Sequence, residues 1–190
     1  MLALSTTNKK LVEDIINKGY ANAAKSFSTL TGQEVTLETT AFEYGNSNEY
    51  LRKKFGHLAK LTILQTNIVG IFNGVSYLIL TKEDREAVAS MSLSAFGNPK
   101  DIDEETVLKE VDNIIAASMI TELSNALEAS IYGDVPHFFE VDNIEVLNKK
   151  LDQPTNSHLL LAHTHFLFEG QVTNPIFIWQ FNNELLDLLS

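Results

Sequence analysis

A row of polar side chains is the part of this 190-residue chain whose residue types and spacing could do chemistry. Thr106, Glu110 and Asn113 stand four and three residues apart, and Ala117 follows after four more. At this spacing the residues line one face of a helix. A carboxylate accepts charge-assisted hydrogen bonds, and a carboxamide both donates and accepts hydrogen bonds, so the row would hold a charged acceptor and a two-way hydrogen-bonding group on one rigid support for a partner. An ordinary solvated helix face has the same composition.

More conventional catalytic groups are missing from the sequence. There is no cysteine, no serine in a recognisable pattern with histidine and acid, and no phosphate-binding or dinucleotide glycine pattern. His163 and His165 alternate with His158 nearby, but such a pair on a strand is more typical of structure than of a metal site. The sequence therefore predicts no metal site.

The wider spacing carries a family resemblance. The pattern Thr106-x3-Glu110-x2-Asn113-x22-Pro136 resembles the signature of the CheC, CheX and FliY phosphatases of bacterial chemotaxis. In that signature Asp or Ser, then Glu, Asn and Pro, stand at these intervals. Glu110, Asn113 and Pro136 match in type and spacing, whereas Thr106 replaces Asp or Ser. The run NIIAASMITELSNAL also looks like the family's sequence after the motif.

The resemblance implies a protein substrate, a CheY-type receiver that carries an aspartyl phosphate. The receiver already holds Mg²⁺ beside this labile bond, so the phosphatase needs no cofactor of its own. Asn113 would position the attacking water, and Glu110 would dock the lysine of the receiver's active site. The alternative is a non-catalytic interaction module that binds a CheD-like deamidase, a receiver or the flagellar switch.

A long helix must carry this row. Apolar spacing predicts it over residues 104–131, with acidic residues in its first turn and Gly133 and Pro136 beyond its end. The expected buried stripe comprises Val107, Leu108, Val111, Ile114, Ile115, Ser118, Met119, Leu123, Ala126 and Leu127.

The remaining elements follow from periodicity and turn residues. An earlier helix is predicted over 9–31, with Leu11, Ile15, Gly19, Ala23, Phe27 and Leu30 on its buried side. Strands are predicted over 33–40, 61–70 and 74–81 in the first half and over 137–148, 157–168 and 176–181 in the second. Shorter helices are predicted over 81–93 and 182–190, an exposed connection over 44–54 and a break at 97–99.

The second half repeats the first. An offset of 96 places Leu11, Ile15, Phe27 and Leu30 on Val107, Val111, Leu123 and Ala126. We expect one α/β domain over 1–190, made of repeats at about 9–96 and 104–190 related by a pseudo-twofold axis. Two long helices then pack on a mainly antiparallel sheet, which the resemblance also implies.

The offset also predicts a second, reduced site. Asp14 takes the place of Glu110, and Asn17 takes that of Asn113. Lys10 and Thr40 stand where Thr106 and Pro136 stand in the second half. Because an aspartate is one methylene shorter than a glutamate, this site is either weaker or vestigial.

Composition narrows the partners. The formal net charge is -11, which argues against nucleic acid or an anionic membrane surface. No apolar run reaches the length of a membrane span, and no leader pattern is seen. We therefore expect a cytoplasmic protein with a protein partner.

Overall fold

The computed structural model describes residues 6–44, 52–53, 55–57, 60–95, 102–151, 157–168 and 170–188. The predicted break at 97–99 and most of the predicted connection over 44–54 lie outside these residues. The helices are α1 (Thr6–Thr31), α3 (Lys82–Ala95), α4 (Glu104–Leu127), α5 (Ile144–Leu151) and α6 (Asn183–Leu188). The strands are β1 (Val35–Tyr44), β2 (Leu61–Gly70), β3 (Gly74–Leu80), β4 (Ile131–Gly133), β5 (His137–Val141), β6 (Ser157–Phe168), β7 (Gln171–Thr173) and β8 (Ile176–Asn182).

One antiparallel sheet joins the two halves of the chain. Its strand order is β1-β6-β8-β3-β2-β4, with β5 also paired to β2 and β7 to β6. The offset of 96 relates β2 to β6, and it relates β1 to β4 together with β5. Counted inward from one edge the strands are β1, β6 and β8, and counted inward from the other edge they are β4 with β5, then β2 and β3. The antiparallel pair β3–β8 therefore lies at the pseudo-twofold axis. This arrangement confirms the predicted fold class.

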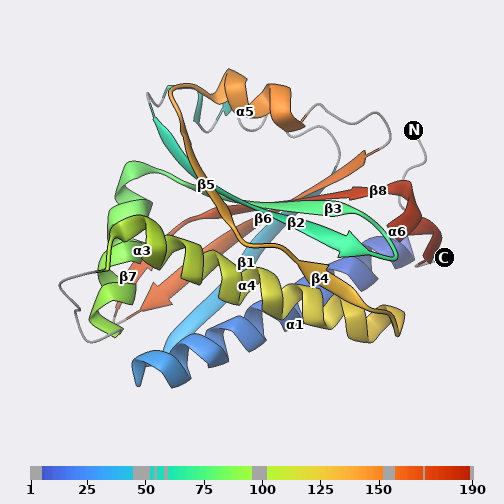
Figure 1. Ribbon diagram of the computed structural model, residues 1–190, viewed down its shortest axis with the longest axis horizontal. Coiled ribbons are helices and arrows are strands. Elements are labelled where there is room, and N and C mark those ends of the chain that lie inside the picture. Colours follow the sequence, from blue (N-terminus) through green and yellow to red (C-terminus); the bar gives the residue numbers. More distant parts are fainter. Residues whose placement is uncertain are drawn as a thin grey trace.

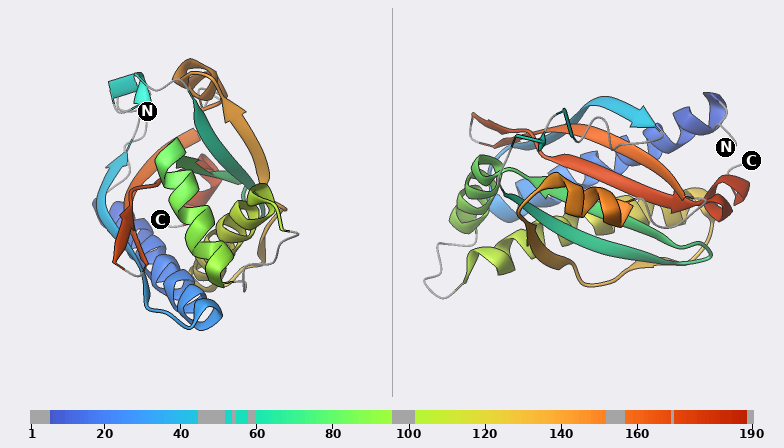
Figure 2. Two further views of the ribbon diagram at one scale, coloured as in Figure 1. Left: turned by 90° about the vertical axis from the view of Figure 1, so that its left-hand side faces the viewer. Right: turned by 90° about the horizontal axis from the view of Figure 1, so that it is seen from above.

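The helices divide between the two faces of the sheet. The long helices α1 and α4 lie together on one face, and α5 lies on the other (Figure 1). The left view of Figure 2 shows the same arrangement from the end, with the sheet between α5 and the two long helices. The core under α1 and α4 contains the stacked rings of Phe177 and Trp179. The face under α5 is covered by Ile144 and Leu147 of that helix.

The buried stripes of α1 and α4 are equivalent. Each of the eight buried residues of α1 has a buried counterpart 96 residues later. The α1 set is Val12, Ile15, Ile16, Gly19, Tyr20, Ala23, Ala24 and Phe27. The α4 set is Leu108, Val111, Asp112, Ile115, Ala116, Met119, Ile120 and Leu123, with Val107 in addition. The repeat inferred from sequence is therefore also a repeat of packing.

The predicted stripes were wrong at their ends. Leu11 is 39% exposed and Leu30 is 44% exposed, and Ala126 is exposed too. A row taken at every fourth residue drifts around a helix of 3.6 residues per turn, by about 40° at each step. The end members of such a row therefore leave the buried face, and Val12, Ile16 and Tyr20 fill it instead.

The long helix α4 is shorter than the predicted 104–131. It ends at Leu127 because Glu128 adopts a left-handed conformation with φ 49° and ψ 40°. The Ala129 N–H then donates to the Ser124 carbonyl at 3.1 Å, which closes the last turn. The chain turns there, and Ile131 begins β4.

The predicted strand over 137–148 was also wrong in its second part. Strand β5 ends at Val141, and α5 begins at Ile144. The side chain of Asn143 caps this helix, accepting hydrogen bonds from the N–H groups of Glu145 at 3.0 Å and Val146 at 3.3 Å. The apolar residues here have helical spacing, which the strand interpretation overlooked.

Helices α1 and α4 approach each other closely at Gly19. A Cβ atom built on Gly19 would lie 2.7 Å from the Met119 Cα, so the two helix backbones are in direct contact there. No residue larger than glycine fits without a shift of one helix against the other. The positions of both helix faces relative to the sheet depend on this contact.

We predict that Gly19→Ala lowers the free energy of unfolding by about 1–3 kcal/mol. At an exposed helix position the same substitution would raise the free energy of unfolding by up to about 1 kcal/mol. The sign of the change therefore shows whether the two helices touch at Gly19. Urea denaturation measures the effect, with the exposed Ala21→Ser on the same helix as control. A stabilised Gly19→Ala protein would show that the helices do not touch there.

Candidate functional site on the outer face of α4

The first turn of α4 is capped by Asp103. Its carboxylate Oδ1 accepts a hydrogen bond from the Thr106 N–H at 2.7 Å. Hydrogen bonds from the backbone and side chain of Thr106 hold the pKa of Asp103 below its usual value. Thr106 thus lies at the start of the helix, exposed, one turn before Glu110.

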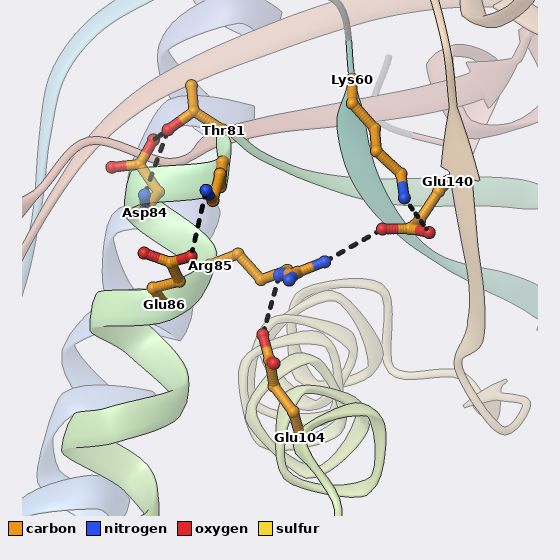
Figure 3. Close-up of polar contacts among 8 residues, drawn as sticks. Lys60, Thr81, Asp84, Arg85, Glu86, Glu104 and Glu140 are labelled. Atoms are coloured by element: carbon orange, nitrogen blue, oxygen red, sulfur yellow. Dashed lines mark hydrogen bonds and ion pairs between the residues drawn. The ribbon is translucent and has the colours of Figure 1, made fainter.

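Ion pairs tie this end of α4 to its neighbours. The Arg85 side chain, on α3, lies 2.8 Å from Glu104 on α4 and 2.9 Å from Glu140 on β5 (Figure 3). Glu140 also pairs with Lys60 at 2.7 Å. Because these groups are partly exposed, each pair contributes at most about 1 kcal/mol. Together they connect three elements around the first turn of the helix.

The predicted row lies on the exposed side of this anchored helix. Glu110, Asn113 and Ala117 are exposed, while the opposite side of α4 is buried. Side chains at this spacing are about 5–6 Å apart at their Cβ atoms. Among the residues that the structure describes, the side chains of Glu110 and Asn113 make no hydrogen bond or ion pair. The fold therefore leaves both groups exposed on the outer side of the helix, where a macromolecular partner can reach them.

Pro136 is buried, in a break between two edge strands. Strand β4 pairs Gly133 with Ile68, and β5 pairs His137 with Gln65, so three residues face two on β2. Proline suits such a bulge because it has no N–H to donate. Thr66, one of the two β2 residues opposite this bulge, donates a hydrogen bond to Asp112 of α4, so the bulge lies near the turn of α4 that contains Asp112 and Asn113.

The second predicted site lies on α1 in the equivalent position. Asp14 and Asn17 are exposed, and so is Lys10. The residue equivalent to Pro136 is Thr40, and β1 has a register shift there, between Thr39 and Ala41. Each repeat thus has a bulge at the same place, with proline only in the second.

The surfaces of the two helices differ in charge. Helix α1 contains four lysines and two acidic residues. Helix α4 contains four acidic residues outside its buried side, Glu104, Glu105, Glu110 and Glu122, and one lysine, Lys109, which pairs with Glu105 at 2.6 Å. A cationic group of a partner is therefore attracted to α4 and not to α1.

A buried carboxyl group lies directly beside the row. Asp112 is 2% exposed, and its Oδ2 accepts a hydrogen bond from the Thr66 hydroxyl at 2.7 Å. Burial raises the pKa of Asp112 to about 7, and the Thr66 bond opposes this rise. The sequence interpretation missed it, although Asp112 stands between Leu108 and Ala116 at helical spacing. A lone acid inside an apolar stripe was the available signal.

The histidines and the helices bear on two other kinds of site, a metal centre and a membrane-spanning segment. His163 pairs with Glu43 on the neighbouring strand at 3.0 Å. Over the described parts of the chain, no three His, Asp or Glu residues are grouped as a metal site would require. Nor does any helix in these parts combine the length and apolar character needed to cross a membrane.

Several solved structures share this fold. Thermotoga maritima FliY matches it with a TM-score of 0.72 at 15% identity, covering 100% of this chain and 96% of FliY. A chain of the FliG–FliM complex from H. pylori matches with a TM-score of 0.66 at 10% identity, covering 97% and 98% of the two chains. The chemotaxis protein CheX from Desulfovibrio desulfuricans matches with a TM-score of 0.54 at 18% identity, covering 88% and 97%.

At these identities the likeness is one of fold. No protein-family model matches the chain, and no curated protein sequence matches it. FliY and CheX, which the Glu110, Asn113 and Pro136 spacing suggested, are nevertheless among the structures that share its architecture.

Asp112 predicts a specific pH dependence of stability. Its pKa in the folded chain, about 7, is above the unfolded value of about 4, so folding takes up a proton between these limits. The contribution of Asp112 to the free energy of unfolding is therefore fully present below about pH 4. It falls by up to about 4 kcal/mol as the pH rises to about 7. The difference in unfolding free energy between wild type and Asp112→Asn should follow this curve in urea titrations.

The control is Glu110→Gln, which removes an exposed carboxylate from the same helix. It should keep the fall in stability that Asp112 causes between pH 4 and pH 7. A wild-type curve parallel to that of Asp112→Asn would mean that folding does not raise the pKa of Asp112.

Proposed function

We propose that this protein is an aspartyl-phosphate phosphatase that acts on a phosphorylated CheY-type receiver in bacterial chemotaxis. The observation that carries the proposal is the exposed Glu110–Asn113 pair on the outer side of α4, with Pro136 in the bulge opposite Thr66, which contacts Asp112 of the same turn. The fold shared with FliY and CheX supports it. The proposed setting is the cytoplasm, where such receivers act.

The reaction asks little of the phosphatase beyond positioning. An aspartyl phosphate is a labile bond, and the receiver's own Mg²⁺ lies beside it. The remaining task is to hold a water molecule in line with the phosphorus atom. The Asn113 carboxamide can accept a hydrogen bond from that water and donate another to the phosphoryl group. Because Asn113 projects from a helix buried on its other side, its backbone is fixed before the receiver arrives.

Glu110 has a different role in this proposal. A carboxylate would repel the phosphoryl group, so Glu110 does not approach it. It pairs instead with the lysine of the receiver's active site and thereby fixes the position of the Asn113 side chain relative to the phosphoryl group. The excess of acidic residues on α4 favours this encounter.

The equivalent face of α1 contributes less to this proposal. Asp14 and Asn17 are exposed in the same geometry, but the shorter carboxylate stands one helical turn from Lys10 on one side and from Lys18 on the other. A receiver lysine is therefore bound less strongly there. We propose that α4 carries the activity and that the α1 face is reduced.

The second candidate function is a non-catalytic docking module. It is favoured by the match to a chain of the FliG–FliM complex, a complex of two proteins, at a TM-score of 0.66. In this case the helix faces would bind a receiver, a CheD-like deamidase or a component of the flagellar switch without hydrolysis. The two functions differ in one observable, the lifetime of the receiver phosphate.

The roles of Asn113 and Glu110 predict different mutant kinetics. Asn113→Ala should lower the maximal rate of receiver dephosphorylation by about 10²-fold and leave receiver binding largely intact. Glu110→Lys should instead weaken binding by about tenfold to a hundredfold, because it places like charges together. Decay of the phosphorylated receiver at several phosphatase concentrations separates the two parameters.

The control is Asn125→Ala, the same substitution at an exposed position near the other end of α4. It should leave both parameters at their wild-type values. If Asn113→Ala lost binding but kept the maximal rate, the assigned roles would be wrong. A wild-type protein that binds a receiver without shortening the life of its phosphate would establish the docking module.

The reduced site predicts a smaller effect. Asn17→Ala should keep the dephosphorylation rate within about twofold of wild type, and adding it to Asn113→Ala should change nothing further. The same decay assay measures both variants. A loss for Asn17→Ala as large as that for Asn113→Ala would show two working sites.

A further inference from the structure

We propose that Asp112 is a proton-controlled positioning residue for the Asn113 turn of α4. The neutral form of Asp112 keeps this turn packed against β2, and the ionised form weakens that packing. The effect on dephosphorylation rests on the proposed function, whereas the effect on the helix does not.

The contact between Asp112 and β2 is at the level of the row. The Thr66 hydroxyl donates to the Asp112 carboxyl at 2.7 Å, and both residues are buried. Thr66 is one of the two β2 residues opposite the bulge that contains Pro136. Asn67, the other residue, is bound to Asp134 through its N–H at 2.9 Å and its carboxamide at 2.6 Å. Asp112 thus joins the Asn113 turn to the point where the edge strands separate.

The surroundings of Asp112 contain no compensating charge among the described residues. The group facing it from α1 is the Tyr20 hydroxyl, which accepts from the Trp179 Nε1 at 3.3 Å. From β2 there is only the hydroxyl of Thr66. On its own helix, Glu110 is exposed and Lys109 is paired with Glu105. An ionised Asp112 would therefore be a buried charge with one hydrogen bond.

The first repeat shows that the fold does not require this acid. Under the offset of 96, Asp112 corresponds to Ile16, and Thr66 corresponds to Ala162. Both counterparts are buried apolar residues of the same hydrophobic core. The carboxyl–hydroxyl pair is therefore an addition to the repeat that carries Glu110 and Asn113.

Burial raises the pKa of Asp112 to about 7, so both of its forms are populated near neutral pH. Ionisation draws the carboxylate toward water, which it can reach only if α4 lifts or water enters beside the bulge. Either change displaces Asn113, the next residue. Receiver dephosphorylation should then fall as the pH rises through about 7.

The direct test is NMR of the full chain without a receiver. The Asn113 side-chain amide signals should titrate with a midpoint near pH 7 in wild type, and this titration should be absent from Asp112→Asn. Thr66→Val removes the donor to the carboxylate and should move the midpoint to higher pH. The Thr66→Val variant therefore tests the proposal even if the Asp112→Asn protein does not fold. Glu105→Gln, an exposed change on α4, serves as control.

The second readout is the acceleration of receiver dephosphorylation. It is the rate at which the receiver loses its phosphate with this protein present, divided by the rate for the receiver alone. The ratio of this acceleration at pH 6 to that at pH 8 should be up to about tenfold for wild type and near one for Asp112→Asn. An Asn113 titration without any acceleration would support the positioning role and count against the phosphatase. Asn113 signals that do not titrate near pH 7, or that titrate equally in Asp112→Asn, would overturn the proposal.

Discussion

The pairing of β3 with β8 is the contact on which the rest of this structure depends. It joins two repeats into one sheet and so gives both long helices the same face to cover. Each helix can bury only one stripe, and Gly19 against Met119 sets how closely the two approach. The opposite sides of α1 and α4 must then face outward. Two equivalent polar rows on the surface are a consequence of this construction, whatever each row does.

The two rows have diverged on a common frame. The bulge in the edge strand is present in both repeats, so it belongs to the frame, but only the second repeat fills it with Pro136. The acidic surface of α4 and the buried Asp112 are also confined to the second repeat. These differences are grouped around Asn113, and that grouping is why we assign the activity to α4.

The sequence was informative wherever one local rule decided the structure. Apolar spacing and the offset of 96 predicted the repeat and the fold class, and the Glu110 and Asn113 positions proved to be exposed. Prediction failed where a single residue or a distant partner decided. The left-handed Glu128 and the Asn143 cap ended or began a helix against the surrounding pattern.

The surroundings of Asp112 could not be predicted from local sequence patterns. Its only hydrogen-bond donor among the described residues, Thr66, stands 46 residues earlier in the chain. Helical spacing could have placed the carboxyl group in the buried stripe. It could not have shown what faces the group there, because that depends on how the sheet brings β2 beneath α4.

The central claim, that the α4 face docks the receiver, can be tested directly because the chain contains no cysteine. Ala117 and Ala21 are exposed at equivalent positions in the two rows. A fluorophore on Ala117→Cys or Ala21→Cys then reports which face is covered when a phosphorylated or beryllofluoride-activated receiver is added. We predict a saturable response from position 117 and little or none from position 21. A response from position 21 alone, with position 117 silent, would contradict the account.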